Sequence, residues 1–220
     1  MNEAANPQGA PATTTRGEST RERIMQSAAR VLARKGYAAT TLAEIAEGAG
    51  TKAGSMYYYI DNREGLIRGL MTRGIIETHA YVKHAVENLG SDATSQDRLG
   101  AAIGAHMRFM LTENDIARAS IRTLGQAPPD VQGPAIELHR RYGHYFSSLI
   151  EDAKSDGFLA TDVDARLLRL LIIGAANWST AWYQTTGANS ADDIAELLVR
   201  MARGDLLPPG DSKSRGTDNA

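Results

Sequence analysis

Apolar side chains recur every three or four residues along most of this sequence, and no stretch alternates apolar and polar residues as a strand does. That spacing is typical of helices that bury one stripe of side chains. Beyond a pair of short helices near residue 50, glycines, prolines and capping residues divide the pattern into helices expected at 64–89, 95–112, 115–124, 133–156, 162–183 and 191–203. The sequence therefore predicts an all-α protein.

Residues 41–59 have the pattern of two short helices joined by a tight turn. Thr41 and Glu44 are spaced as a capping box, which marks the start of a helix. A buried stripe follows, made of Leu42, Ile45, Ala46 and Ala49. The glycines of residues 48–50 permit a sharp turn, and Thr51 is expected to cap a second helix that runs through Tyr57. This is the pattern of a helix-turn-helix.

The second of these helices has the composition of a DNA recognition helix. Its first turn carries the small residues Ala53, Gly54 and Ser55, which allow close approach to a large partner, and it ends in three consecutive tyrosines. A recognition helix enters the major groove with its N-terminal residues at the base edges. Three adjacent tyrosines cannot all point inward, so at least one is expected to be exposed, although the alternative that they are core aromatics stays open. The expected DNA contacts are Thr41, Lys52, Ala53, Ser55, Tyr57, Tyr58, Tyr59 and Arg63.

Residues 21–70 resemble the DNA-binding domain of the TetR family of bacterial transcriptional regulators. The resemblance rests on Ile24, Ala28, Ala29, Lys35, Gly36, Tyr37, Thr41, Ile45, Ala46, Ala49, Gly50, Gly54, Met56, Tyr57, Asn62, Arg63, Glu64 and Leu66. It implies phosphate contacts by Thr41, Ser55, Tyr59 and Arg63, and base contacts by Lys52, Ala53 and Tyr57. The sequence departs from the family pattern at Thr51, Lys52, Tyr59, Ile60 and Arg63, so the operator sequence cannot be predicted.

Charge and composition agree with a DNA-binding regulator. The net charge of the 220 residues is -2, but residues 20–70 contain eight basic and five acidic residues, which indicates a basic end on an otherwise acidic protein. Ordinary helix surface charge is the alternative explanation. No cysteine is present, and no apolar run approaches the roughly 20 residues of a membrane span. The sequence predicts a cytoplasmic protein without membrane contact.

The composition divides the chain into four parts. Residues 1–18 and 207–220 lack the apolar pattern of a core and are expected to be a disordered arm and tail. Residues 19–66 form the expected three-helix DNA-binding domain, and residues 67–206 the expected ligand-binding and dimerisation domain. Arg16 in the arm is a candidate for the minor groove, with a solvated leader as the simpler alternative.

The segment 167–178 predicts a homodimer. It is apolar nearly all round, so both of its faces need burial. The final helix offers a second apolar stripe, made of Ile194, Leu197, Leu198 and Met201. Two such helices from each of two chains make a four-helix interface, and the TetR resemblance implies the same arrangement. A single, wholly buried central helix is the alternative.

The helices of the body contain methionines, aromatics and a few polar residues suited to a bulky apolar ligand. The expected ligand contacts are His79, His106, Met107, Met110, Arg122, Tyr142, Phe146, Asn177 and Trp178, with ordinary core packing as the alternative for each. Residues 174–183 are similar to a TetR branch that controls fatty-acid, steroid or aromatic-acid breakdown, in which several members respond to acyl-CoA thioesters. A drug-like hydrophobic effector is the competing choice.

These patterns predict a ligand-responsive repressor that binds a palindromic double-stranded DNA operator as a dimer and is released by a hydrophobic effector. An effector-independent architectural DNA-binding protein is the alternative. The five histidines are scattered, and no phosphate-cradling loop is present. The sequence therefore predicts no catalytic site, no metal site and no cofactor.

Overall fold

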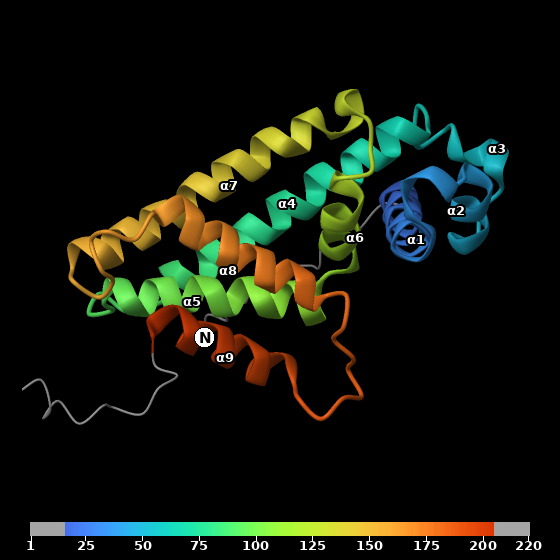
Figure 1. The fold of residues 1–220 in the computed structure, drawn as a ribbon. Helices are drawn as coiled ribbons and strands as arrows, with labels where there is room; N and C mark the ends of the chain where they lie inside the picture. The colour runs from blue at the N-terminus through green and yellow to red at the C-terminus, as the bar shows by residue number, and fades with distance from the viewer. Residues whose placement is uncertain (1–15, 205–220) are drawn as a thin grey trace, which may run out of the picture.

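The computed structural model describes residues 16–204, and within that range the chain is helical, without strands. The elements in order are α1 (Arg16–Ala39), α2 (Leu42–Gly48), α3 (Ala53–Met56), α4 (Arg63–Glu87), α5 (Ser95–Arg108), the π-helical turn η1 (Phe109–Glu113), α6 (Asp115–Leu124), α7 (Pro129–Ser155), α8 (Ala165–Ser179) and α9 (Ala191–Arg203). Figure 1 shows α1, α2 and α3 together at one end, with the remaining helices forming an elongated body. The all-α prediction is confirmed.

The three N-terminal helices share a core with the first turns of α4. Ile24 of α1, Ile45 of α2 and Met56 of α3 are fully buried, and they belong to the same cluster as Ile67 and Leu70 of α4. The cluster continues into α6 and α7. Since α4 contributes to this core and then continues through the body, one rigid helix joins the two parts of the molecule (Figure 1).

A glycine turn sets the angle between α2 and α3. Gly50 has φ +65°, a left-handed conformation that glycine adopts without steric cost. The amide of Thr51 donates to the Ala46 carbonyl at 3.0 Å, and the Gly50 amide donates to the Glu47 carbonyl at 3.0 Å. These two bonds form a Schellman motif, which satisfies the last carbonyls of α2. The predicted turn at residues 48–50 is therefore confirmed.

The body is built from α4, α5, α7, α8 and α9, which share a second core. Val82, Ile103, Phe146 and Ile150 lie at its centre, each almost completely buried. Figure 1 shows α9 beneath α5 and α8 in front, while α6 stands between the body and α1. The helix α6 therefore occupies the junction between the three N-terminal helices and the rest of the described chain.

The expected helix boundaries differ from the observed ones by one or two residues in α3 and α4, where α4 covers Arg63–Glu87 of the expected 64–89, and differ more clearly at four further places. The helix α1 begins at Arg16, so residues 16–18 are helical and not part of an arm. The helix predicted at 95–112 changes to π geometry at Phe109. The helix α7 begins at Pro129. Proline suits the first helical position because the amide N–H that it lacks has no partner within the helix at that position. The helix α8 covers only Ala165–Ser179 of the predicted 162–183.

The remaining 1–15 of the predicted arm and the whole predicted tail, 207–220, lie outside the described residues. Within residues 16–204, no helix combines the length and the apolar character that crossing a bilayer demands.

Candidate DNA-binding face and effector cavity

The predicted recognition helix is a single α-helical turn, α3, followed by tighter turns. Its N-cap is Lys52, which makes no side-chain capping bond, so the expectation that Thr51 caps this helix is wrong. The Ser55 amide donates to the Lys52 carbonyl at 2.9 Å, and the Tyr59 amide donates to the Met56 carbonyl at 2.8 Å. The fully buried Met56 anchors this segment to the core, and the other α3 residues are exposed.

The three consecutive tyrosines point in different directions, as their spacing requires. The exposed fractions of Tyr57 and Tyr58 are 63% and 85%, whereas Tyr59 is half-buried and packs against the N-terminal core. The Tyr58 and Tyr59 rings meet edge to face at 5.1 Å, and the Tyr59 carbonyl accepts from Arg21 Nη2 at 3.2 Å. The expectation that at least one tyrosine is exposed is confirmed. Lys52, Ala53 and Ser55 are exposed on the same short segment.

Thr41 caps α2 as predicted. Its hydroxyl accepts from the Glu44 amide at 3.3 Å and donates to Glu44 Oε2 at 3.0 Å. Lys35 of α1 pairs with the same carboxylate. The Lys35 ammonium, with the Thr41 hydroxyl, lowers the pKa of Glu44 below its usual range. Thr41 itself is exposed, immediately before the start of α2.

Arg63, which we expected to anchor a DNA phosphate, has its guanidinium turned into the domain. Its Nε donates to the Thr40 carbonyl at 2.7 Å, and its Nη2 donates to the Tyr37 carbonyl. The guanidinium also lies 4.4 Å from the Tyr37 ring centroid, a cation–π contact. Arg63 therefore fastens the end of α1 and Thr40 after it to the start of α4, a structural role that the sequence analysis did not predict.

A chain of charged and polar side chains joins α1 to the body. Arg73 of α4 pairs with Glu22 of α1, with Nη2 3.2 Å from Oε1, and with Glu77 of α4 at 2.5 Å. Glu77 also accepts from Asn114, the N-cap of α6. The hydrogen bond from Arg73 lowers the pKa of Glu22. This network connects α1, α4 and α6 through one arginine.

The body contains a cavity of about 750 Å³ between α4, α5, α6, α7 and α8. Its walls fall into three groups. The apolar part is formed by Ile75, Met110, Ala117, Ile121, Leu124, Ile136, Leu170 and Ile173. An uncharged polar part contains His106, Tyr142 and Asn177, and a basic part contains His139, Arg140, His144, Arg166 and Arg169.

The polar part is a hydrogen-bonded row centred on His106. Its Nδ1 lies 2.8 Å from the Tyr142 hydroxyl, and its Nε2 lies 3.2 Å from Asn177 Oδ1. Because an amide oxygen only accepts, Nε2 carries the proton and Nδ1 accepts from Tyr142. Burial lowers the pKa of His106 to about 4 and raises the pKa of Tyr142. The row is therefore neutral near pH 7, and it presents the Asn177 amide N–H groups as further donors.

The basic part contains two buried nitrogens without a hydrogen-bond partner, His139 Nε2 and Arg169 Nε. Burial lowers the pKa of His139 to about 4. The Arg169 guanidinium crosses α7 at Gly143, where an added Cβ would lie 1.8 Å from Nη1. Since a buried polar atom without a partner is costly, these groups are suited to receive polar atoms of a ligand.

The structure places four of the nine predicted ligand residues in the cavity wall: His106, Met110, Tyr142 and Asn177. The other five lie elsewhere. Met107 is buried in the core, where its sulfur accepts from the Ser179 hydroxyl at 3.1 Å, and Phe146 is also core. His79 packs on the Tyr142 and Tyr145 rings. Trp178 is 70% exposed, and Arg122 lies in a different cleft, beside α1.

Sequence reasoning missed the basic part of the cavity. His139 and Gly143 lie three residues before and one residue after Tyr142, so the helical period places all three on one side of α7. Arg166, Arg169 and Ile173 are spaced in the same way on α8. Extending the predicted contact at Tyr142 along that period would have identified His139.

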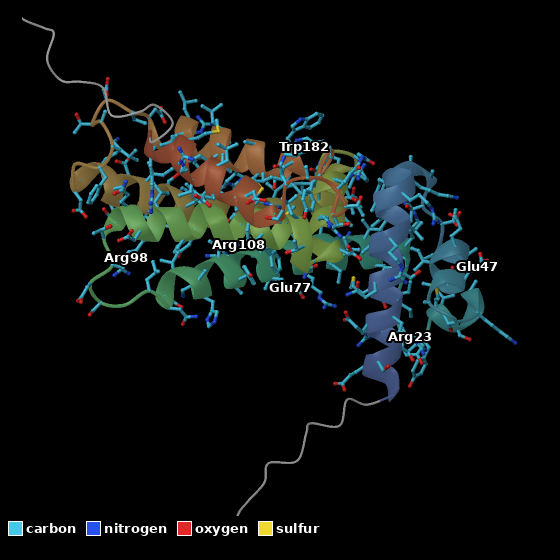
Figure 2. All side chains as sticks on the ribbon, turned by 90° about the horizontal axis from the view of Figure 1, so that it is seen from below. Arg23, Glu47, Glu77, Arg98, Arg108 and Trp182 are labelled. Carbon is cyan, nitrogen blue, oxygen red and sulfur yellow. The ribbon has the colours of Figure 1, made fainter. Side chains whose placement is uncertain are left out.

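The outer faces of α8 and α9 form an exposed apolar surface in the single chain. It consists of Leu167, Leu171 and Trp178 of α8, Trp182 after the end of α8, and Leu197 and Met201 of α9. Leu170 is also exposed, at the edge where α8 borders the cavity. The opposite side of α8 packs into the body through Ile172 and Ala176. Leu171 is 72% exposed, and Figure 2 shows Trp182 projecting outward from the body. These are the helices from which the sequence predicted a dimer.

Two family descriptions match the sequence. Residues 24–70 match "Bacterial regulatory proteins, tetR family". Residues 92–206 match "Tetracyclin repressor-like, C-terminal domain". The first range contains the helix-turn-helix, and the second contains α5 to α9.

Curated relatives and solved structures agree with these matches. The fatty acid metabolism regulator protein of Bacillus subtilis is 22% identical over 181 residues, which cover 80% of this chain and 92% of that protein. The HTH-type transcriptional repressor KstR2 of Rhodococcus jostii is 24% identical over 208 residues, which cover 90% and 97%. The structure of AibR in complex with isovaleryl coenzyme A and operator DNA has a TM-score of 0.73 at 20% identity, covering 83% of this chain and 97% of that chain.

Proposed function

Because the chain belongs to the TetR family of bacterial transcriptional regulators, we propose that it represses transcription as a homodimer bound to a palindromic operator and is released by an acyl-CoA thioester. One observation carries the proposal. The helix α4 runs without interruption from Arg63, at the DNA-binding end, to Gly74, Ile75 and Thr78 in the cavity wall. A ligand that moves α4 in the body therefore also moves the DNA-binding end.

The DNA-binding role is supported by the exposed residues around α3. Lys52, Ala53, Tyr57 and Tyr58 project from a segment that Met56 holds in place. Lysine donates to guanine acceptors or phosphates, and the alanine methyl fits a thymine methyl. Thr41, Ser55 and Tyr59 supply hydroxyls for the DNA backbone. The proposed contacts are those that the sequence predicted. Arg63 differs from the others because its first role is to hold segments of the protein together.

The homodimer is supported by the exposed apolar surface of α8 and α9. A contiguous patch of large apolar side chains on a monomer marks an interaction site, and pairing two copies of α8 and α9 covers it. A two-fold dimer presents two recognition segments to one duplex. Half-sites about one helical turn apart then form a palindrome.

The acyl-CoA assignment is supported by the three parts of the cavity. An acyl chain fits the apolar wall, a thioester carbonyl accepts from the Asn177 amide, and anionic phosphates suit Arg166 and Arg169. AibR, which shares the fold, is described with isovaleryl coenzyme A and operator DNA. A hydrophobic drug would use the apolar wall but would leave the basic part without a counterpart.

The proposed release follows from differential affinity. A ligand changes the equilibrium only as far as it prefers one state, and coupling free energies of about 1–3 kcal/mol are typical. The thioester enlarges or reshapes the space between α4 and α6, and the Arg73–Glu22 pair transmits the movement of α4 to α1. The two recognition segments then no longer match their half-sites.

Operator binding is tested by fluorescence anisotropy with the DNA upstream of the protein's own gene, followed by footprinting. Lys52→Ala and Tyr57→Phe are each expected to weaken specific binding about tenfold. Lys83→Ala, an exposed lysine of α4, is the matched control and should bind as wild type does. If all three variants bound the operator with equal affinity, and also bound random DNA with equal affinity, the assigned face would be rejected.

The effector is tested on the same complex with isovaleryl-CoA, palmitoyl-CoA, the free acids and CoA alone. The thioesters are expected to release the operator, and Arg169→Gln should require higher thioester concentrations than Arg141→Gln, an exposed arginine outside the cavity wall. Release by hydrophobic drugs but by no thioester would overturn the acyl-CoA assignment. Operator binding that no ligand alters would favour an architectural DNA-binding protein.

A further inference from the structure

A second, smaller cleft lies where α6 meets α1, and its charged side chains are mostly arginines. The α1–α6 cleft has a volume of about 400 Å³. Its polar residues are Arg30 and Arg34 of α1, Asp115, Arg118 and Arg122 of α6, and Thr180, which follows α8. Four arginines and one aspartate give these described side chains a formal charge of +3 (four positive, one negative).

The arrangement of these arginines is unfavourable for the protein alone. Arg30 and Arg34 are four residues apart on α1, and Arg118 and Arg122 are four residues apart on α6. Like charges at that spacing on a helix repel each other, and here two such pairs face each other across one cleft. A bound anion would remove this repulsion.

The nearby acids leave much of this charge uncompensated. Asp115 pairs with Arg118, whose Nη1 also donates to the Leu111 carbonyl at 2.9 Å. Arg30 donates to the Gly48 carbonyl at 3.4 Å. Within the described residues, Arg34 and Arg122 have neither a hydrogen bond nor an ion pair.

Two further acids lie on the other side of the α1 arginines. Glu44 and Glu47 line an adjoining groove that Arg30 and Arg34 also border. Glu44 is engaged by Lys35. Glu47 forms no ion pair with a described residue, and Figure 2 shows it on the part of α2 that faces away from the body. The α1–α6 cleft itself keeps its excess of positive charge.

We propose that the α1–α6 cleft binds a small phosphorylated anion, separately from the effector cavity. A guanidinium group can donate two parallel hydrogen bonds to the oxygens of one phosphate, whereas a lysine ammonium acts as a point charge. A cluster of arginines therefore favours phosphate. Arg34 and Arg122 supply the free donors, and Arg30 and Arg118 add charge. Thr180 also lines the cleft, but its hydroxyl already donates to the Asn177 carbonyl at 2.7 Å. The cleft is large enough for two linked phosphates.

The position of the cleft gives the anion a consequence for DNA binding. The helix α6 lines the cleft with Arg118 and Arg122, and it lines the effector cavity with Ser120 and Ile121 on its other side. An anion held between α1 and α6 ties the DNA-binding end to the element that the effector touches. Operator affinity then depends on the anion as well as on the effector. This consequence rests on the proposed function, whereas binding of the anion does not.

Anion binding is tested by isothermal titration calorimetry of the full-length protein with inorganic pyrophosphate, at a constant ionic strength of about 0.15 M. Saturable binding is expected, and Arg34→Gln and Arg122→Gln should each weaken it about tenfold, the usual effect of losing a charged hydrogen bond. Arg98→Gln, at the far end of the body in Figure 2, is the control and should leave the affinity unchanged. Circular dichroism melts establish that each variant is folded.

Several outcomes would overturn the site. One is that pyrophosphate shows no saturable binding to wild type. Another is that Arg98→Gln loses as much pyrophosphate affinity as the cleft variants do. A third is that sulfate binds as well as pyrophosphate and still binds to the double variant R34Q/R122Q. Loss of pyrophosphate binding in Arg169→Gln would place the anion in the effector cavity instead. Displacement by a short random-sequence duplex, with duplex binding lost in R34Q/R122Q, would make these arginines contacts to the DNA backbone.

The link to DNA is measured separately, as operator affinity with and without pyrophosphate. At least a fivefold change is expected for wild type and none for R34Q/R122Q. If the protein binds no operator at all, the proposed function fails while calorimetry still decides the anion site. If calorimetry is positive but operator affinity is unchanged, the coupling is overturned and the site stands.

Discussion

Gly74 of α4 lies against Ser120 of α6 so closely that a methyl group on Gly74 would come within 2.5 Å of the Ser120 Cβ. The Ser120 hydroxyl donates to the Met71 carbonyl at 2.9 Å, which fixes the crossing of the two helices. Both residues also line the cavity in the body, the proposed effector site. The crossing of α4 and α6 is therefore part of the cavity wall, and a ligand that separates these helices acts at this contact.

Gly74→Ala is expected to force α4 and α6 apart. Overpacking of a tight contact costs about 1–3 kcal/mol, so the free energy of unfolding in urea should fall. Gly69→Ala on the same helix is the control, because its new methyl group would meet only Met25 Cε, at 3.9 Å. Alanine is the better helix former, so Gly69→Ala should gain up to about 1 kcal/mol. Equal stability of the two variants would contradict the close crossing.

The Glu22–Arg73 pair is expected to make stability depend on pH in the acid range. The hydrogen bond from Arg73 lowers the pKa of Glu22 in the folded protein. Because the carboxyl pKa is lowered in the folded protein, Glu22 stabilises the fold at pH values above the usual glutamate pKa of about 4.3. This contribution is lost as the pH falls through the pKa of Glu22 in the folded protein. The melting temperature of wild type should therefore fall more steeply between about pH 5 and pH 3 than that of Glu22→Gln. Parallel curves would show that the pair adds no stability.

His106 should make the protein less stable in mild acid. Its folded pKa is about 4, so between the usual histidine value of about 6.5 and that folded value the unfolded chain binds a proton that the folded chain does not. As the pH is lowered across that window, the free energy of unfolding falls by about 1.4 kcal/mol for each pH unit. His106→Gln removes this contribution, and urea unfolding at several pH values should give a shallower dependence. An unchanged slope would mean that His106 is protonated in the folded protein.

Arg63→Ala is expected to lower the stability of the protein in the absence of DNA. The change removes the guanidinium donors from the Thr40 and Tyr37 carbonyls, and the Tyr37 carbonyl keeps only the Thr40 amide, at 3.4 Å. Loss of such a charged hydrogen bond costs about 1–3 kcal/mol, which thermal melting without DNA detects. Arg68→Ala is the control, since Arg68 of α4 forms no hydrogen bond or ion pair with another described residue. If only operator affinity changed, Arg63 would act as a phosphate contact alone.

Leu171→Glu is expected to give a monomer. The side chain is 72% exposed and belongs to the apolar surface of α8 and α9, and a charge placed there would be buried without a partner in the proposed dimer. Ile76→Glu, a half-exposed apolar residue of α4, is the matched control and should leave the assembly intact. Analytical ultracentrifugation measures both. A dimeric Leu171→Glu would move the interface to another surface.

Most local features of this protein are readable in its sequence because they depend on neighbouring residues. The Thr41 cap, the glycine turn and the boundaries of α6 and α9 follow from capping chemistry and helical spacing. Thr51 failed as a cap because it is the last residue of the Schellman motif that ends α2, and Lys52 after it takes the N-cap position of α3. Even this error moved the start of the helix by a single residue.

Tertiary structure alone decided which side chains meet. Arg122 is adjacent to Ile121, yet Ile121 faces the effector cavity and Arg122 the α1–α6 cleft, because successive residues of a helix are rotated by about 100°. Arg63 is drawn inward by carbonyls that are 23 and 26 residues earlier in the chain. The sequence by itself determined the helices, the exposed segment around α3 and the apolar surface of α8 and α9, since these depend on local spacing. The walls of the cavity and the contents of the cleft depend on how five or more helices are rotated against each other, and only their packing sets that.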